Sequence, residues 1–250
     1  MPITNLNSST ESSLIQLKES LKKAYNLSAS REGEISEHSV DFLLSAIFVR
    51  ICTTARTISM MAPEDKSIDS IWDYASLGTL LRNVMDALNS FLYLADSTLS
   101  NDEKNCRFWI FSLHDAVTRQ KIFEFRGSQN EADACEARAE EMRALLRQNS
   151  TFTSLEEKKQ KHYLKGNEAF LLSKEQIIEA NGGNREDFLG LYKFLSSNAH
   201  CYPMGFFKMS EQEFGKGVHS EIEEEYTNMI LSLTASHLDS LCLAYEQYLR

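Results

Sequence analysis

The fold of this chain is decided by residues 71–94, which read IWDYASLGTLLRNVMDALNSFLYL. Only three of these side chains are charged, namely Asp73, Arg82 and Asp86. The apolar side chains recur at three- and four-residue spacing, which is typical of one face of an α-helix. These residues are Leu77, Leu81, Val84, Leu88, Phe91 and Leu92. Because a helix this poor in charge favours the interior of a bundle, we predict an inner helix over residues 71–96.

Helical periodicity dominates the rest of the chain as well. The pattern predicts further helices over residues 13–27, 36–61, 100–127, 131–148, 155–164, 174–180, 185–200 and 221–248. Asp69 or Ser70 is the expected N-cap of the inner helix, Ser100 or Asn101 that of the next one, and Asn184 that of 185–200. We predict that 185–200 is a second inner helix and that 201–217, with Pro203, is a loop.

The chain shows no strand alternation longer than a few residues and no internal repeat. We therefore expect an all-α, antiparallel helical bundle of about six to eight helices. The 250 residues can form a single domain over 1–250, with residues 1–12 flexible.

The composition excludes several classes of protein. With 42% hydrophobic and 25% charged residues, the chain is neither disordered nor of low complexity. Its net charge of −10 disfavours binding to duplex nucleic acid, because phosphate neutralisation needs a basic surface. The basic cluster Lys158–Lys159–Gln160–Lys161–His162 follows two glutamates, which indicates a solvated helix face rather than an RNA-binding strip.

Five well-separated cysteines without a Cys-x-x-Cys pair indicate a reducing, cytoplasmic compartment. The polar N-terminus has no signal-like segment, and the most apolar stretch, residues 42–52, is interrupted by Arg50. A bilayer span needs about 20 largely apolar residues. We therefore expect no association with a membrane.

Several sequence motifs that would indicate chemistry are absent. The chain has no phosphate loop, dinucleotide fingerprint, HExxH motif or nucleophile elbow. None of its histidines has a glutamate three residues before it, as helical di-iron sites require. The acidic run 221–225 favours a first helical turn that interacts with the helix dipole over a cation site. We expect neither a cofactor nor a metal.

The inner helix carries one polar stripe. Arg82, Asp86, Asn89 and Tyr93 follow one another at i, i+4, i+7 and i+11, which places them on one face. If this helix is central, the arginine is partly buried and needs a carboxylate, which Asp86 can provide. The favoured interpretation is a structural ion pair that ties helices together.

Residues 185–200 carry a matching stripe of Tyr192, Ser196 and His200 at four-residue spacing. His200 ends that helix, where the dipole favours a protonated imidazole. We predict that these three residues converge with Arg82 and Asp86 on one partly buried site. Such a cluster could bind a small anion, perform general acid–base chemistry or only fix the register of the helices.

Both segments resemble a widespread bacterial, all-helical family of unknown function, DUF5677. Residues 80–87, LLRNVMDA, are similar to the Arg-x-x-x-Glu helix of that family, and residues 192–200, YKFLSSNAH, are similar to its Tyr-x-x-Leu-Ser-x-x-x-His segment. This chain differs in having Asp86, with a shorter reach, where glutamate is usual. The resemblance implies a helical fold and no established reaction.

A looser resemblance is to HEPN-type bundles, many of which are ribonucleases of toxin or antiphage systems. Their signature is an arginine followed by four to six residues and a histidine, and Arg107-x6-His114 satisfies it. About one such match is expected by chance in a chain of this composition. Phe108 also stands where those ribonucleases usually carry a polar residue.

Three interpretations therefore remain open. The leading one is a cytosolic helical-bundle protein that binds a protein partner, a second copy of itself or a small ligand. The second is a metal-independent, HEPN-like ribonuclease in bacterial stress or antiphage defence, for which RNA would be a substrate. The third is an oligomeric scaffold, which an extended apolar surface on the last helix would favour.

Overall fold

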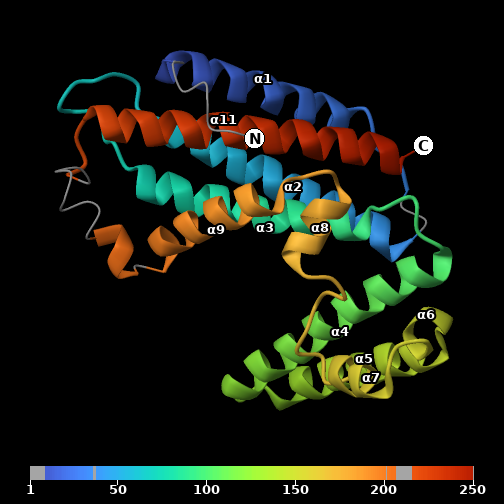
Figure 1. Ribbon diagram of the computed structural model, residues 1–250. Helices are drawn as coiled ribbons and strands as arrows, with labels where there is room; N and C mark the ends of the chain where they lie inside the picture. The colour runs from blue at the N-terminus through green and yellow to red at the C-terminus, as the bar shows by residue number, and fades with distance from the viewer. Residues whose placement is uncertain (1–8, 36–37, 201, 207–215, 250) are drawn as a thin grey trace. The chain divides into compact units, whose positions relative to one another are not determined.

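The computed structural model of the chain describes residues 9–35, 38–200, 202–206 and 216–249. The only regular secondary structure in these residues is helical, with no strand, which confirms the all-α prediction (Figure 1). Seven helices have 15 residues or more, and the short helices α6, α7 and α8 lie between them. Because of these short helices, the expected number of six to eight is not confirmed.

The helices form two compact units. Unit 1 comprises residues 1–95 and 174–250, and unit 2 comprises residues 96–173. The helices of unit 1 are α1 (Thr10–Ala29), α2 (Ser39–Met61), α3 (Tyr74–Leu94), α8 (Lys174–Ala180), α9 (Arg185–Ala199) and α11 (Glu221–Tyr248). Those of unit 2 are α4 (Asn101–Phe125), α5 (Gln129–Gln148), α6 (Ser150–Thr153) and α7 (Glu157–Tyr163). A single domain stays a prediction, because two compact units of one chain can unfold together.

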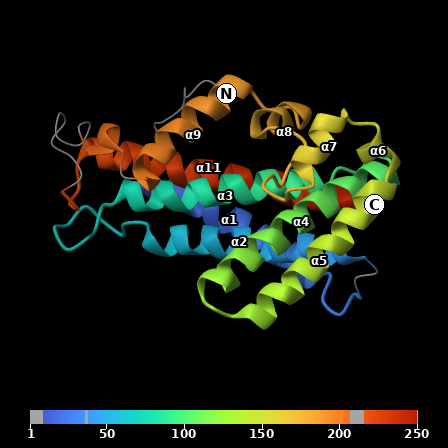
Figure 2. The ribbon, with the colours of Figure 1, turned by 90° about the horizontal axis from the view of Figure 1, so that it is seen from below.

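Helix α3 is the inner helix of unit 1, as predicted. It contacts α2, α11, α9 and α8, and Figures 1 and 2 show it alongside these helices. Its apolar face is fully buried at Leu81, Val84 and Phe91. The helix therefore provides a fixed platform from which its polar stripe can reach α8 and α9.

Helix α9 is not a second inner helix, and that expectation was wrong. It contacts α3 and α8, and only Phe188, Leu195 and Ser197 are buried. Most of its surface is open, because one narrow stripe is enough to attach it to α3. The polar stripe of α9 thus lies at the border between the packed face and solvent.

The start of α3 also differs from the prediction. The helix begins three residues later, and its cap is Asp73, whose Oδ1 accepts a hydrogen bond from the Ser76 N–H at 3.0 Å. Asp69 and Ser70 do not cap it. The Ser70 hydroxyl instead donates to Asp65 at 2.6 Å, which closes the turn before the helix.

Two other predicted caps are confirmed. Ser100 Oγ accepts from the Glu103 N–H at 3.2 Å at the start of α4. Asn184 Oδ1 accepts from the Asp187 N–H at 3.0 Å at the start of α9. Both helices therefore begin where a short polar side chain can satisfy their first free N–H groups.

Unit 2 has a core of its own between α4, α5 and α6. The buried residues are Cys106, Ile110, Leu113, Ala116, Val117, Ala139, Met142, Leu146 and Phe152. After α7 the chain passes close to this core at Gly166, where φ is +70° and a Cβ atom would lie 2.6 Å from Val117 Cγ2. Only glycine fits such a combination of backbone angle and close approach.

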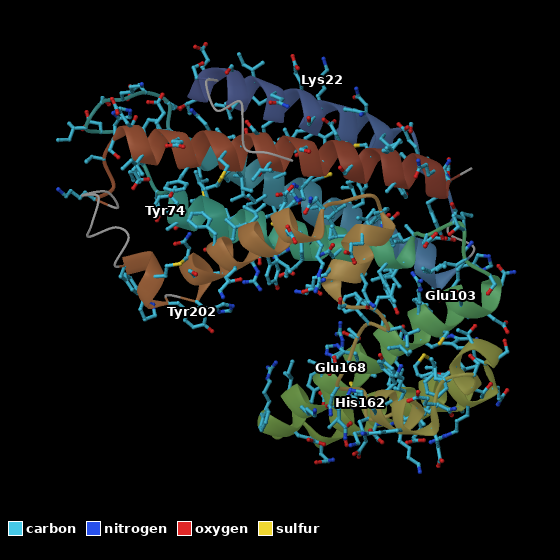
Figure 3. All side chains as sticks on the ribbon, viewed as in Figure 1. Lys22, Tyr74, Glu103, His162, Glu168 and Tyr202 are labelled. Atoms are coloured by element: carbon cyan, nitrogen blue, oxygen red, sulfur yellow. The ribbon has the colours of Figure 1, made fainter. Side chains whose placement is uncertain are left out.

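The basic cluster of the sequence lies on α7, which has no buried residue. Lys161 forms an ion pair with Glu157 at 2.6 Å. His162 lies 3.6 Å from Glu168, and both are labelled in Figure 3. The cluster is therefore a solvated helix face with acidic neighbours, as predicted.

The predicted loop over 201–217 and the predicted flexible segment 1–12 fall partly outside the described residues. Residues 203–206 are helical, so a continuous loop over 201–217 is wrong there, while 201 and 207–215 lie outside the described part. The predicted flexible segment 1–12 falls on undescribed residues as far as 8. From Thr10 onwards the chain is already in α1, which is capped by Ser9.

Among the described helices, α2 is the one long and apolar enough to cross a membrane by length and composition. In the structure its face with Leu44, Phe48 and Ile51 is buried in the core of unit 1. Since a core helix meets the same criterion, α2 is weak evidence for a membrane span. The absence of membrane association stays a prediction.

Candidate functional site

Helices α3 and α9 bring four of the predicted site residues together. The guanidinium of Arg82 on α3 donates from Nη1 to Ser196 Oγ and from Nη2 to the Tyr192 hydroxyl, both at 2.5 Å. The two acceptors lie one turn apart on α9. Ser196 also donates to the backbone carbonyl of Tyr192 at 2.5 Å, so its hydroxyl both accepts and donates.

Asp86, one turn after Arg82, joins the same group. Its Oδ2 lies 3.5 Å from Arg82 Nε, and its Oδ1 accepts from Lys174 Nζ at 2.5 Å. The Lys174 ammonium also donates to the Tyr192 hydroxyl at 2.6 Å. We call Arg82, Asp86, Lys174, Tyr192 and Ser196 the Arg82 cluster.

Tyr192 is the centre of the Arg82 cluster. Arg82 Cζ lies 4.0 Å and Lys174 Nζ 4.7 Å from the centroid of its ring, which allows cation–π attraction to both cations. The ring of Phe188, one turn earlier on α9, packs against Tyr192, with 5.4 Å between the two ring centroids. One phenol therefore positions two positive charges by its face and by its oxygen.

The Arg82 cluster has more positive than negative charge. It contains two cations, Arg82 and Lys174, and one carboxylate, Asp86. Because both cations bond the same hydroxyl oxygen, their nitrogens lie within about 5 Å of each other, where repulsion amounts to about 3 kcal/mol at an effective dielectric constant of about 20. Asp86 offsets part of this repulsion and leaves a net charge of +1.

Lys174 is held in its charged form. Burial lowers the pKa of this ammonium, but hydrogen bonds to Asp86 and Tyr192 outweigh that effect, so the pKa lies above its usual value. The site is open to solvent on this side, since the side chains of Lys174 and Asp86 are 36% and 35% exposed, against 14% for Arg82. Solvent can therefore reach Lys174 and Asp86.

Tyr192, Lys174 and Arg82 each keep unused hydrogen-bond donors within the described part of the chain. The Tyr192 hydroxyl accepts two bonds but has no acceptor for its own hydrogen. Lys174 uses two of its three N–H groups. The Nε of Arg82 is buried and makes no hydrogen bond. The Arg82 Nε lies 3.5 Å from Asp86 Oδ2, whereas the donors of Lys174 and Tyr192 are available to an acceptor from outside the chain.

His200 is not brought into the Arg82 cluster. It is exposed at the end of α9, and its ring lies 5.5 Å from that of Tyr202, which Figure 3 labels. No hydrogen bond or ion pair joins it to Arg82 or Asp86 among the described residues. The rest of the predicted stripe, Asn89 and Tyr93, is buried, and both amide atoms of Asn89 lack a partner.

The weaker candidates, Arg107 and His114, lie on α4 in unit 2. Arg107 is buried and forms an ion pair at 2.7 Å with Glu103, one turn earlier and labelled in Figure 3. His114 is half-buried two turns further along the helix. The guanidinium of Arg107 is thus engaged inside unit 2.

Lys174 is the residue that sequence reasoning missed. It opens a short helix that was predicted, but it lies 88 positions from Asp86 and 18 positions from Tyr192. No spacing rule connects positions so far apart. The sequence carried no signal for it, because Arg82 and Asp86 already neutralise each other in the predicted ion pair.

Other kinds of chemistry receive no support from the described residues. No group of three or more His, Cys, Asp or Glu side chains is placed to hold a metal ion. Burial raises the pKa of the Cys52 thiol to about 12 and those of Cys106 and Cys242 to about 11, so these thiols are poor nucleophiles.

Fold and site together define an all-helical protein whose inner helix presents a half-buried ionic cluster. The model of DUF5677, a family of unknown function, matches residues 41–216, which include α3, α9 and the whole Arg82 cluster. The chain belongs to this family. Neither the search of curated proteins nor that of solved structures found a match.

Proposed function

We propose that this protein binds a small ligand through the Arg82 cluster. The observation that carries the proposal is the set of unused donors beside two cations that share one carboxylate. A network that only ties helices together is expected to balance its own charges, because like charges held close together cost free energy. The Arg82 cluster keeps an excess positive charge, and Lys174, which has an unused N–H, is exposed to solvent.

The competing explanation is that the cluster only ties α3, α8 and α9 together. A double substitution separates the two explanations. Arg82→Met with Asp86→Leu removes the ion pair and keeps the volume, which is often neutral for stability. The matched control is Arg119→Met with Asp115→Leu, which removes an exposed i,i+4 pair in unit 2.

Thermal unfolding of the three proteins is measured with a panel of carboxylates, phosphate esters, amines and sugars. A ligand that binds the native state raises the unfolding temperature. We expect at least one compound to stabilise the wild type and the control pair but not the cluster variant. If no compound does so, the cluster is structural.

A second candidate function is a metal-independent, HEPN-like ribonuclease in bacterial stress or antiphage defence. What favours it is His200, which is exposed at the C-terminal end of α9, where an RNA substrate could reach it. The pair Arg107–His114 gives less support, since Arg107 is buried beside Glu103. Cleavage of single-stranded RNA by the wild type and not by His200→Ala would establish the enzyme, and no cleavage by the wild type would exclude it on that substrate.

Binding to a protein partner or to a second copy is a further part of the proposal. It is supported by exposed apolar side chains on α2, namely Phe42, Val49 and Met60. Of the large hydrophobic residues in the described part of α11, only Leu243 is exposed, so the last helix lacks the surface that a scaffold would need. Light scattering of the purified chain at increasing concentration tests for a homo-oligomer.

The cytoplasmic location also belongs to this proposal. Its support is that the four described cysteines are free and three of them are buried, as expected of a protein that folds in a reducing compartment. Fractionation of cells that express a tagged full-length chain tests it.

A further inference from the structure

Resting on the proposed function, we infer that the ligand of the Arg82 cluster is a singly charged oxyanion, either a carboxylate or a phosphodiester. Its oxygens accept hydrogen bonds from the unused N–H of Lys174 and the O–H of Tyr192, and its charge lies against the Arg82 guanidinium. The chemistry shared by both ligand classes is one negative charge spread over two oxygen atoms.

The charge and the unused donors of the cluster favour a ligand that brings acceptors. The unused groups of Arg82, Lys174 and Tyr192 are donors. The Tyr192 oxygen already accepts two hydrogen bonds, and the charge of Asp86 is offset by the two cations that face it. An acceptor that carries a negative charge therefore fits the cluster better than a donor, and charged acceptors form the stronger bonds.

The net charge selects one negative charge over two. A monoanion neutralises the +1 of the cluster. A dianion doubles the attraction, but the cost of removing its hydration grows with the square of its charge, and Asp86 stays fixed against Lys174 at 2.5 Å. A half-buried site of this charge therefore favours the monoanion.

A polyanion is disfavoured on a larger scale. The chain carries a net charge of −10, which repels extended phosphate backbones at long range. A small monoanion experiences much less of this repulsion, so the local charge of the cluster decides its binding. We therefore expect a ligand that is small and carries a single negative charge.

The experiment titrates the full-length protein at pH 7.5 with acetate, dimethyl phosphate and methyl phosphate, with chloride to keep the ionic strength constant. Methyl phosphate is mostly a dianion at this pH, because the second pKa of a phosphate monoester is about 6. The readout is the NMR signal of the ¹³C-labelled Tyr192 side chain, assigned from its loss in Tyr192→Phe. The dissociation constant follows from the shift of this signal.

We expect acetate or dimethyl phosphate to saturate the shift, and methyl phosphate to bind at least about threefold more weakly. Lys174→Met should weaken binding about tenfold or more, since it removes a charge-assisted hydrogen bond. Lys193→Met, which removes an exposed neighbouring charge on α9, should leave it unchanged. In Tyr192→Phe, the same anions should raise the unfolding temperature less, although the contacts of Arg82 and Lys174 with the aromatic ring remain.

The inference is overturned if methyl phosphate binds as tightly as the monoanions, or if Lys174→Met and Lys193→Met lower the affinity equally. If none of the anions acts but an amine or a sugar of the panel stabilises the protein through the cluster, this inference fails and the proposed function stands. If no compound acts through the cluster, both fail.

Discussion

Unit 1 and unit 2 each contain an arginine paired with a carboxylate one turn away, and the two pairs differ in what surrounds them. In unit 2, Arg107 is buried and forms an ion pair with Glu103. In unit 1, Arg82 shares Asp86 with Lys174, and two hydroxyls of α9 receive its N–H groups. The same helical spacing thus gives an ion pair inside one core and, in the other, an ion pair that a second, solvent-exposed cation joins. A pair becomes a candidate site when neighbouring helices add charge that the pair cannot neutralise.

The largest expected loss of stability is at the Arg107–Glu103 pair of unit 2. Glu103→Ala removes the carboxylate from Arg107, whose side chain is only 9% exposed, and should lower the free energy of unfolding by about 3 kcal/mol. Urea denaturation gives this value. Asp115→Ala, at an exposed pair of the same helix, serves as the control and should cost less than about 1 kcal/mol. Equal losses of stability in Glu103→Ala and Asp115→Ala would mean that the burial of Arg107 does not raise the cost of removing its carboxylate partner.

Asp86→Ala should lower the free energy of unfolding by about 2 kcal/mol, less than Glu103→Ala, because water can solvate the cations that it leaves: Lys174 is 36% and Arg82 14% exposed, against 9% for Arg107. This change leaves Arg82 and Lys174 facing each other without a carboxylate. Adding Lys174→Met should therefore recover part of the loss, since it removes the repulsion. A double variant that is no more stable than Asp86→Ala alone would contradict repulsion between Arg82 and Lys174.

The residues of unit 1 show how much of the fold and of the candidate site could be predicted from the sequence. The low charge of residues 71–94 correctly predicted an inner helix, and the i,i+4 spacing correctly predicted that Arg82 has Asp86 beside it. Spacing along one helix could not predict Lys174, because that contact depends on how α8 folds back onto α3. His200 shares the stripe of Tyr192 and Ser196 but lies one turn further, where α9 ends and the chain is exposed. Periodicity places residues on a face, whereas the length of contact between two helices decides which of them meet.

Tyr192→Phe should have a smaller effect, about 1 kcal/mol. The ring and its contacts with both cations remain, and only the hydroxyl that accepts from Arg82 and Lys174 is lost. Because these two donors are partly exposed, water can replace the lost acceptor. Urea denaturation beside Tyr163→Phe in unit 2 measures the difference, and a loss above about 3 kcal/mol would indicate a structural network that depends on this hydroxyl.

The smallest expected effect is the dependence of stability on pH that Lys174 contributes. Its pKa in the folded protein lies above the ordinary value of 10.5, because the hydrogen bonds to Asp86 and Tyr192 outweigh burial. A raised pKa stabilises the folded state below the unfolded value, and this contribution is lost as the pH rises through the folded value. The wild type should therefore be more stable than Lys174→Met by a constant amount from neutral pH to about pH 9.5, and by less above that pH. For a group this exposed, the difference should be below about 1 kcal/mol.

Other alkaline groups, such as Tyr74 with a pKa of about 12, are present in both proteins and cancel in the difference. Lys193→Met should show no such change with pH. A difference that grows between pH 9.5 and 11 would mean that Lys174 is not stabilised in its charged form, and the positive charge of the cluster would then rest on Arg82 alone.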